Sequence, residues 1–191
     1  MITGIILASG FSNRMGRDKL LIKLKDETLI ETVIKACKES ELDKLLLVYR
    51  QKEVKDIGEK YNLETILNSN ANLGQSESIK LGVAGVKMDS DFMFIMGDQP
   101  FIDKEHINKL INKYNNSEKG ILVPYYNSKR GMPSIFGGKY RDELLRVQGD
   151  KGGRDLMKKH KEDLEEFHFQ DEKLGKDIDT PEDLEVVKKW V

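Results

Sequence analysis

The sequence predicts an α/β protein built on an open, mainly parallel β-sheet with helices on both faces. Continuous apolar runs of strand length recur along the chain, and segments with helical apolar spacing lie between them. The runs are apolar throughout rather than alternating, which is typical of parallel strands buried on both faces. Strands that alternate with helices in this way indicate parallel strands joined by crossover helices. Such sheets bind ligands at the carboxyl ends of their strands.

The first half of the chain supplies most of this pattern. Residues 3–7 form a short apolar run, which we expect to be the first strand, and a polar, glycine-containing loop follows it to Lys19. Three more runs have the length of a strand: 44–50, 64–67 and 91–96. Helical spacing predicts helices at 28–39, 53–61, 76–86 and 103–114. Asp103 is a suitable N-cap for the last of these helices.

The second half is less regular. We expect short strands at 120–123 and 134–136, an edge strand at 165–169, and helices at 140–147, 152–160 and 181–190. Thr180, Pro181 and Asp183 have the residue types favoured at the N-cap and in the first turn of the last helix. No internal repeat, low-complexity tract or linker interrupts the pattern, so we expect one domain over residues 1–191.

Composition limits the possible classes of protein. The 32 basic and 33 acidic residues give a net charge of −1, which favours neither nucleic acid nor membrane as a partner. No segment approaches the roughly 20 apolar residues of a membrane span, and the apolar start of the chain is too short for a signal peptide. Cys37 is the only cysteine and cannot form an internal disulfide, which fits a reducing compartment. We therefore expect a cytoplasmic protein.

The loop after the first strand carries a possible phosphate site. Residues 7–19 read LASGFSNRMGRDK, and the small residues at 8–10 allow the backbone to approach a ligand closely. Successive N–H groups in such a turn can form an anion-binding nest. The loop also carries three cationic side chains: Arg14, Arg17 and Lys19. It matches neither a Walker A motif nor a dinucleotide fingerprint. A tight turn with solvated basic residues is the alternative interpretation.

A carboxylate follows the apolar run at 91–96. Asp98 precedes Pro100 and is well placed to hold a hard cation. A magnesium ion held there could bridge the carboxylate to phosphate oxygens. The alternative is a turn aspartate that caps its own backbone. Because Asp98 and the loop at 7–19 both follow strands of one sheet, we expect them at the same edge. A phosphate cradle facing a carboxylate is what metal-assisted phosphoryl chemistry requires.

Several motifs, in order, resemble those of the MobA-like NTP transferases. The loop with its next two residues, LASGFSNRMGRDKLL, is similar to the signature of that family, and GDQP at 97–100 looks like its metal-binding motif. RGMPSIF at 130–136 and GDKGGR at 149–154 resemble motifs of the molybdenum cofactor cytidylyltransferases. DIDTPEDL at 177–184 is similar to the closing motif. The resemblance runs from Ile5 to about Val187 and implies a Rossmann-like, three-layer αβα nucleotidyltransferase fold.

The resemblance also implies a reaction. The enzyme would use Mg²⁺ to transfer CMP from CTP to the terminal phosphate of molybdenum-molybdopterin. The products would be pyrophosphate and molybdopterin cytosine dinucleotide, the cofactor form that a molybdenum hydroxylase would receive. Two alternatives stay open: a guanylyltransferase or other NTP transferase on the same fold, and a non-catalytic carrier of the molybdenum cofactor.

The residue roles follow from the same resemblance. Arg14 would face the β- and γ-phosphates, Lys19 the α-phosphate, and Asp98 would bind the metal, with Asp177 or Asp179 as a second metal carboxylate. Nucleotide contacts would also come from the strand end, the loop and a later segment: Leu7, Ala8, Ser9, Gly10, Asn68, Gly74 and Ser78. The acceptor would meet a cationic, glycine-containing set: Arg130, Gly131, Pro133, Gly149, Asp150, Lys151 and Arg154.

One loop position bears on the choice of nucleotide. Ser9 stands where guanylyl-transferring relatives usually carry glycine and cytidylyl-transferring relatives often carry alanine. A side chain at this position would crowd a purine more than a pyrimidine. Ser9 therefore favours CTP over GTP.

Overall fold

A large mixed sheet forms the centre of the molecule. The computed structural model describes residues 1–16, 18–149 and 153–190. In spatial order the strands are β10 (Leu164–Phe169), β7 (Ile121–Tyr126), β9 (Ser134–Phe136), β6 (Asp91–Met96), β1 (Ile2–Ala8), β4 (Lys44–Tyr49) and β5 (Glu64–Leu67). Strand β8 (Lys129–Arg130) pairs with β7 outside this row. Most neighbours are parallel, but β9 runs antiparallel to both β6 and β7.

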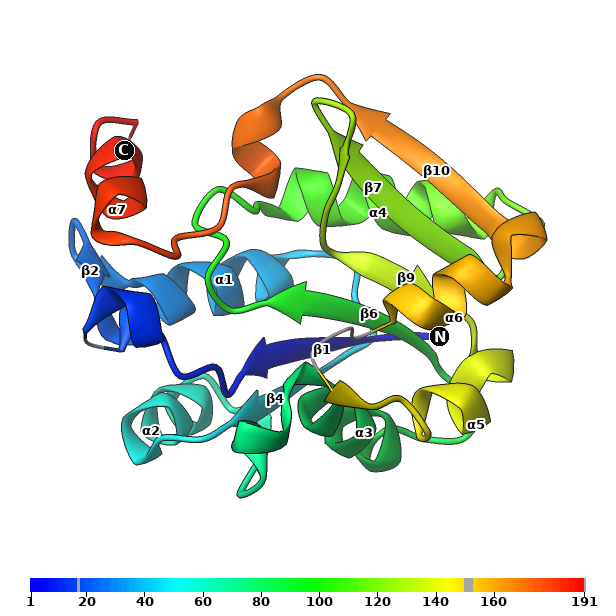
Figure 1. Ribbon diagram of the computed structural model, residues 1–191, viewed down its shortest axis with the longest axis horizontal. Helices are drawn as coiled ribbons and strands as arrows, with labels where there is room; N and C mark the ends of the chain where they lie inside the picture. The colour runs from blue at the N-terminus through cyan, green and yellow to red at the C-terminus, as the bar shows by residue number, and fades with distance from the viewer. Residues whose placement is uncertain (17, 150–152, 191) are drawn as a thin grey trace.

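Helices cover both faces of this sheet. In chain order they are α1 (Leu29–Glu39), α2 (Lys52–Lys60), α3 (Gln75–Gly85), α4 (Lys104–Asn115), α5 (Arg141–Leu144), α6 (Arg154–Lys159) and α7 (Pro181–Lys188). Figure 1 shows α1 and α4 on one side of β1 and α3 and α5 on the other. The protein therefore has the predicted three-layer α/β architecture.

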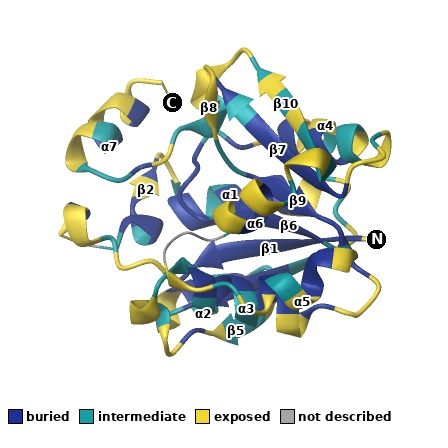
Figure 2. Ribbon diagram, turned by 45° about the vertical axis from the view of Figure 1, so that its right-hand side comes forward, coloured by how far each residue is buried: buried dark blue, intermediate teal, exposed yellow. Residues whose placement is uncertain are grey.

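The two layers of packing follow from the alternation of side chains along each strand. Ile6 of β1 packs in one core cluster with α1, α2 and α4, whereas Ile5 packs in another with α3, α5 and α6. Both isoleucines are fully buried. Figure 2 shows β1 and β6 as buried strands, which explains why their sequences are apolar throughout.

A third, smaller core holds the end of the chain against the sheet edge. Ile178 and Leu184 pack with Leu24 and Leu29, around the short hairpin formed by β2 (Lys23–Leu24) and β3 (Glu27–Thr28). The Ile178 N–H also donates to the backbone oxygen of Asp98, at 3.2 Å. This packing brings the segment that precedes α7 beside the turn that follows β6.

Several predicted elements have different bounds. The strand predicted at 120–123 continues through Pro124 to Tyr126, and the helix predicted at 140–147 is a 3₁₀ turn, η4 (Gly138–Tyr140), followed by the short α5. The hairpin of β2 and β3 was not predicted. The helix predicted at 152–160 is α6, and its first predicted residue lies outside the described residues. Within the described part of the chain, no helix has both the length and the apolarity that crossing a bilayer requires.

Candidate active site

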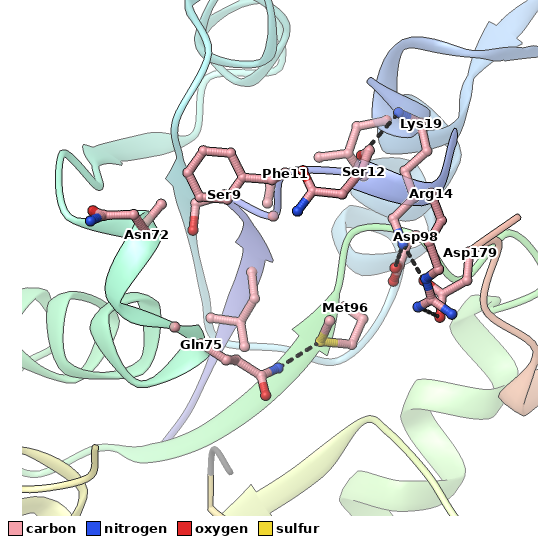
Figure 3. A pocket seen from close by; sticks show the side chains of 17 residues that line it. Ser9, Phe11, Ser12, Arg14, Lys19, Asn72, Gln75, Met96, Asp98 and Asp179 are labelled. Carbon is pink, nitrogen blue, oxygen red and sulfur yellow. Dashed lines mark hydrogen bonds and ion pairs between the residues drawn. The ribbon is translucent and has the colours of Figure 1, made fainter. Parts of the chain in front are cut away.

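A cavity of about 520 Å³ lies at the carboxyl ends of β1 and β6 (Figure 3). Residues 7–14 form one wall, and the 3₁₀ turn η3 (Ala71–Leu73) with the start of α3 contributes to another. Gly74 joins η3 to α3 with φ 105°, a conformation that side-chain-bearing residues rarely adopt. Lys19, Asp98 and Asp179 complete the lining. The cavity thus collects the loop after β1 and the carboxylate after β6, as the sequence predicted.

Charged side chains gather at one end of this cavity. Lys19 Nζ lies 2.5 Å from Asp98 Oδ2 and 2.7 Å from Asp179 Oδ1. Arg14 Nη2 lies 2.6 Å from Asp179 Oδ2. Figure 3 shows these four side chains together, with Ser9 and Asn72 toward the opposite end. Two cations therefore pair with two carboxylates in the free protein. A bound phosphate chain would compete with the carboxylates for these cations.

The electrostatics of this end follow from burial and close pairing. Burial lowers the pKa of Lys19, but Asp98 and Asp179 outweigh that effect and raise it above its ordinary value. Burial raises the pKa of Asp179, but Lys19 and Arg14 more than reverse this and hold it below its ordinary value. Asp177 differs from both, because burial, followed by the charges of Asp98 and Asp179, raises its pKa to about 7. A nearby cation would therefore stabilise the charged form of Asp177.

The donor set fits a divalent cation. Asp98 Oδ1 is buried and has no hydrogen-bond partner among the described residues, while Oδ2 faces Lys19. A buried, unpartnered carboxylate oxygen is a hard ligand of the kind that Mg²⁺ and Mn²⁺ bind. Across residues 1–16, 18–149 and 153–190, no three acidic, histidine or cysteine side chains converge as a ready metal cluster. The described residues at this end of the cavity therefore offer individual carboxylates as ligands.

A buried polar cluster lies behind the loop and holds Ser9. The Ser9 and Ser78 hydroxyl oxygens are 2.5 Å apart, and Asn68 Nδ2 donates to both at 3.1 Å. Asn68 is fully buried, and its backbone N–H donates to the Tyr49 oxygen at 2.7 Å. Asn68 and Ser78, both expected to bind nucleotide, thus contact Ser9. Ser9 itself lines the cavity, together with the other residues expected to bind nucleotide: Leu7, Ala8, Gly10, Arg14, Lys19 and Gly74.

A second cavity, of about 270 Å³, adjoins the first. Gln75 and Met96 line both cavities, and the Gln75 amide donates to Met96 Sδ at 3.2 Å (Figure 3). Three residues expected to contact the acceptor line the second cavity: Arg130, Gly131 and Arg154. Asp177 also lines it. Two ligands, one in each cavity, would therefore meet at the wall formed by Gln75 and Met96.

The other residues expected to contact the acceptor are placed differently. Pro133 lies between Met132 and Ser134, which both line the second cavity. Gly149 borders a separate surface cavity with Glu143 and Lys159. Asp150 and Lys151 lie outside the described residues, as does the loop cation Arg17.

Sequence reasoning missed the residues of the shared wall. Gln75 follows Gly74 at the first position of α3, and Met96 is the last residue of β6. Both lie beside positions that were predicted to bind nucleotide or metal, which is the signal that could have found them. Phe11 was also missed; it lines the first cavity with the Arg50 guanidinium 4.5 Å from its ring centre.

Comparison with known proteins agrees with this geometry. PucB, a purine catabolism protein of Bacillus subtilis, is 28% identical over 98% of this chain and 96% of its own length. A probable molybdenum cofactor guanylyltransferase of Natranaerobius thermophilus is also 28% identical, over 100% of this chain and 96% of its own.

Solved structures share the fold. Rv0371c of Mycobacterium tuberculosis superposes with a TM-score of 0.86 at 24% identity, covering 98% of this chain and 97% of its own. The same protein has been solved in complex with manganese, with a TM-score of 0.84 at 23% identity over 100% of this chain and 99% of its own. Residues 4–164 of the present chain match the MobA-like NTP transferase domain. The chain therefore belongs to the MobA-like NTP transferase family of nucleotidyltransferases.

Proposed function

We propose that the protein transfers CMP from CTP to the terminal phosphate of molybdenum-molybdopterin, with Mg²⁺, in the cytoplasm. The products are pyrophosphate and molybdopterin cytosine dinucleotide, which a molybdenum hydroxylase would receive. The observation that carries the proposal is the pair of adjoining cavities with the common wall of Gln75 and Met96. Arg14 and Lys19 line one cavity, and Arg130 and Arg154 line the other. Two anionic substrates fit this arrangement.

The cation would be held by Asp98 together with a carboxylate of the segment 177–179. Phosphate oxygens of the nucleotide would supply further ligands, as is usual for Mg²⁺. When bound, the cation supplies Lewis acidity and neutralises phosphate charge. The unpartnered Asp98 Oδ1 and the raised pKa of Asp177, whose charged form a nearby cation would stabilise, both favour such an ion.

The chain's own task in this reaction is to bring two anions together. The acceptor phosphate is already anionic near neutral pH, so it needs no strong base. Lys19 and Arg14 lie within one network and are placed to turn from their carboxylates to the triphosphate. Positioning and charge stabilisation then carry the catalysis. No serine, cysteine or histidine nucleophile is required.

Ser9 supports CTP as the nucleotide. It is only 5% exposed, and its hydroxyl is fixed by Ser78 and Asn68, so its side chain keeps its volume beside the cavity. A purine would need that space more than a pyrimidine. The N. thermophilus relative, named for guanylyl transfer, makes GTP the second candidate.

The test is pyrophosphate release by the purified protein with each of the four common NTPs, magnesium and molybdenum cofactor. We expect release with CTP that depends on the acceptor and is absent without it. A preference for GTP would replace the nucleotide but keep the reaction class. Nucleotide and cofactor binding with no release from any NTP would favour the non-catalytic carrier instead.

A further inference from the structure

A buried tyrosine outside both cavity linings contacts two walls of the second cavity. Tyr126, the last residue of β7, is 5% exposed. Its ring lies against Gly131, and also against Gly175 at the end of the 3₁₀ turn η7 (Glu172–Gly175). A Cβ atom at either glycine would overlap the ring, so both segments approach it as closely as backbone can. Both glycines line the second cavity, as does nearby Asp177.

The phenol of Tyr126 is fixed by two hydrogen bonds. It donates to the Met132 carbonyl oxygen at 2.9 Å and lies 2.7 Å from Nε2 of His106, a 2% exposed residue of α4. A carbonyl can only accept, so the single phenolic hydrogen is committed to Met132 and His106 Nε2 must donate. This requires hydrogen on Nε2 in the neutral imidazole.

The surroundings of His106 agree with a neutral ring that has its hydrogen on Nε2. His106 Nδ1 is buried without a hydrogen-bond partner in the part of the chain that the structure describes. Burial also lowers the pKa of His106 to about 4, so the ring is neutral near pH 7. Burial, and then the Asp177 carboxylate, raise the pKa of Tyr126, so the phenol keeps its proton. His106 thus orients a permanent donor toward the loop at 130–133.

We propose that Tyr126, oriented by His106, is a positioning residue for the acceptor. It ties the loop at 130–133 to β7 through Met132 and supports the segment at 175–177 through Gly175, so it holds two segments whose residues Arg130 and Asp177 line one cavity. The inference rests on the proposed function only for the identity of the acceptor. The placement of the loop can be measured without any substrate.

The substitution that isolates the hydroxyl is Tyr126→Phe, because the ring and its glycine contacts stay. The first measurement is hydrogen exchange at the Gly131 amide, which donates to the Pro124 oxygen at 2.9 Å. We expect exchange to become about fivefold faster, the scale of one lost hydrogen bond. Amides of β1 should keep their rates. Tyr140→Phe is the matched control, since Tyr140 is also 5% exposed, its hydroxyl donates to Asp163, and neither residue lines either cavity.

The second measurement is the kinetics of pyrophosphate release. Tyr126→Phe should raise the KM for molybdenum cofactor about fivefold and leave the KM for CTP and the kcat within about twofold. His106→Leu should reproduce this change, and His106→Gln, whose amide can donate, should restore most of the wild-type KM. Tyr140→Phe should leave both KM values unchanged.

The outcomes separate this inference from the proposed function. Unchanged Gly131 exchange in Tyr126→Phe would overturn the inference, and so would equal changes in the two KM values. If the wild-type protein releases no pyrophosphate, the proposed function fails, and the exchange rates at Gly131 still decide whether Tyr126 positions the loop.

Discussion

Lys19 links the two carboxylates of the first cavity in the free protein. Its side chain is 11% exposed and its ammonium group lies within 3 Å of both Asp98 and Asp179. Under the proposed function, Lys19 and Arg14 would turn to the triphosphate, and the carboxylates they leave would become free for a cation. Nucleotide and metal binding are therefore expected to support each other.

Substitution of Asp98 tests its assignment to the metal. Asp98 lies in the turn after β6, so we expect Asp98→Ala to keep the fold and to lose at least about 100-fold in turnover, the scale of a lost electrostatic contact in catalysis. Circular dichroism and pyrophosphate release measure the two effects. Asp89→Ala, at an exposed aspartate in the turn before β6, is the control and should remain active. Unfolding of Asp98→Ala, or turnover near that of wild type, would contradict the assignment.

Ser9 can be tested as the feature that disfavours purines. Ser9→Gly removes the side chain beside the cavity, so we expect the ratio of kcat/KM for CTP to that for GTP to fall by roughly tenfold, as for one small group in a pocket. Ser78→Ala is the matched control, because it removes a hydroxyl contact but leaves the Ser9 side chain in place. It should largely keep the CTP preference. An unchanged ratio in Ser9→Gly would remove Ser9 from the specificity argument.

At this scale the sequence predicted which side chains gather, but not how they pair. Arg14, Lys19 and Asp98 could be placed at one sheet edge because each follows a predictable strand. The burial of Asn68 and Ser78 behind Ser9 could not be predicted, since a loop pattern does not say which way a polar side chain points. The pairing of Lys19 with Asp98 depends on packing between distant segments.

The elements with a clear apolar pattern in the sequence were predicted correctly. β1, β4 and β6 are long apolar runs, and α1 and α4 have clear apolar stripes. A strand was expected only over 120–123, and the next residue, Pro124, lacks an N–H group. In the structure β9 pairs with β7 only as far as Leu122, so the strand continues past the proline without losing a bond to β9. β9 lies between β6 and β7 and runs antiparallel to both, and no local sequence pattern indicates this long-range pairing.

The N-cap of α7 connects an element to the site. Thr180 and Asp183 form a capping box, and Asp183 also accepts the Asp179 N–H at 3.2 Å. Thr180→Ala should lower the free energy of unfolding by about 1 kcal/mol. It should also lower kcat, because Asp183, which holds the Asp179 N–H, loses its hydrogen bond from the Thr180 hydroxyl. Denaturant unfolding and pyrophosphate release measure the pair of effects.

Thr28 provides the control for that prediction. It forms the same kind of capping box at α1, with Glu31, away from the cavity. Thr28→Ala should cost a similar free energy of unfolding and leave kcat unchanged. If Thr180→Ala also leaves kcat unchanged, the cap of α7 stabilises the fold without shaping the site.

At the scale of the whole molecule, stability should depend on pH through His106. Burial lowers its pKa from about 6.5 in the unfolded chain to about 4 in the folded protein, while Asp103 acts to raise the folded value and Lys109 to lower it. The unfolded state therefore binds more protons between these pH values. Stability is lost as pH falls from about 6.5 toward 4, by roughly 3 kcal/mol in total.

Comparison of variants separates the effect of His106 on stability from that of carboxylates that titrate in the same pH range. Wild type should lose more free energy of unfolding than His106→Gln over the range from pH 6.5 to 4, measured by urea denaturation. His168→Gln, at an exposed residue of β10, should follow the wild-type curve. Parallel curves for wild type and His106→Gln would contradict a neutral, buried His106.

The α/β architecture was predictable as a whole, because alternating apolar strands and helices leave few arrangements. The single domain over residues 1–191 stays a prediction. The second cavity could not be predicted from pattern, since it depends on where β9 turns back beside β6 and how closely Gly131 and Gly175 approach one ring.

The two cavities are lined mostly by different stretches of the chain. The first cavity draws on residues 7–98 and, beyond them, on Asp179, whereas most of the second comes from residues 130–157 and 175–177. If the first cavity binds the nucleotide and the second the acceptor, as we propose, changes between β7 and β10 would alter the acceptor and leave most of the nucleotide site unchanged. Substrate pairs can thus diversify one partner at a time.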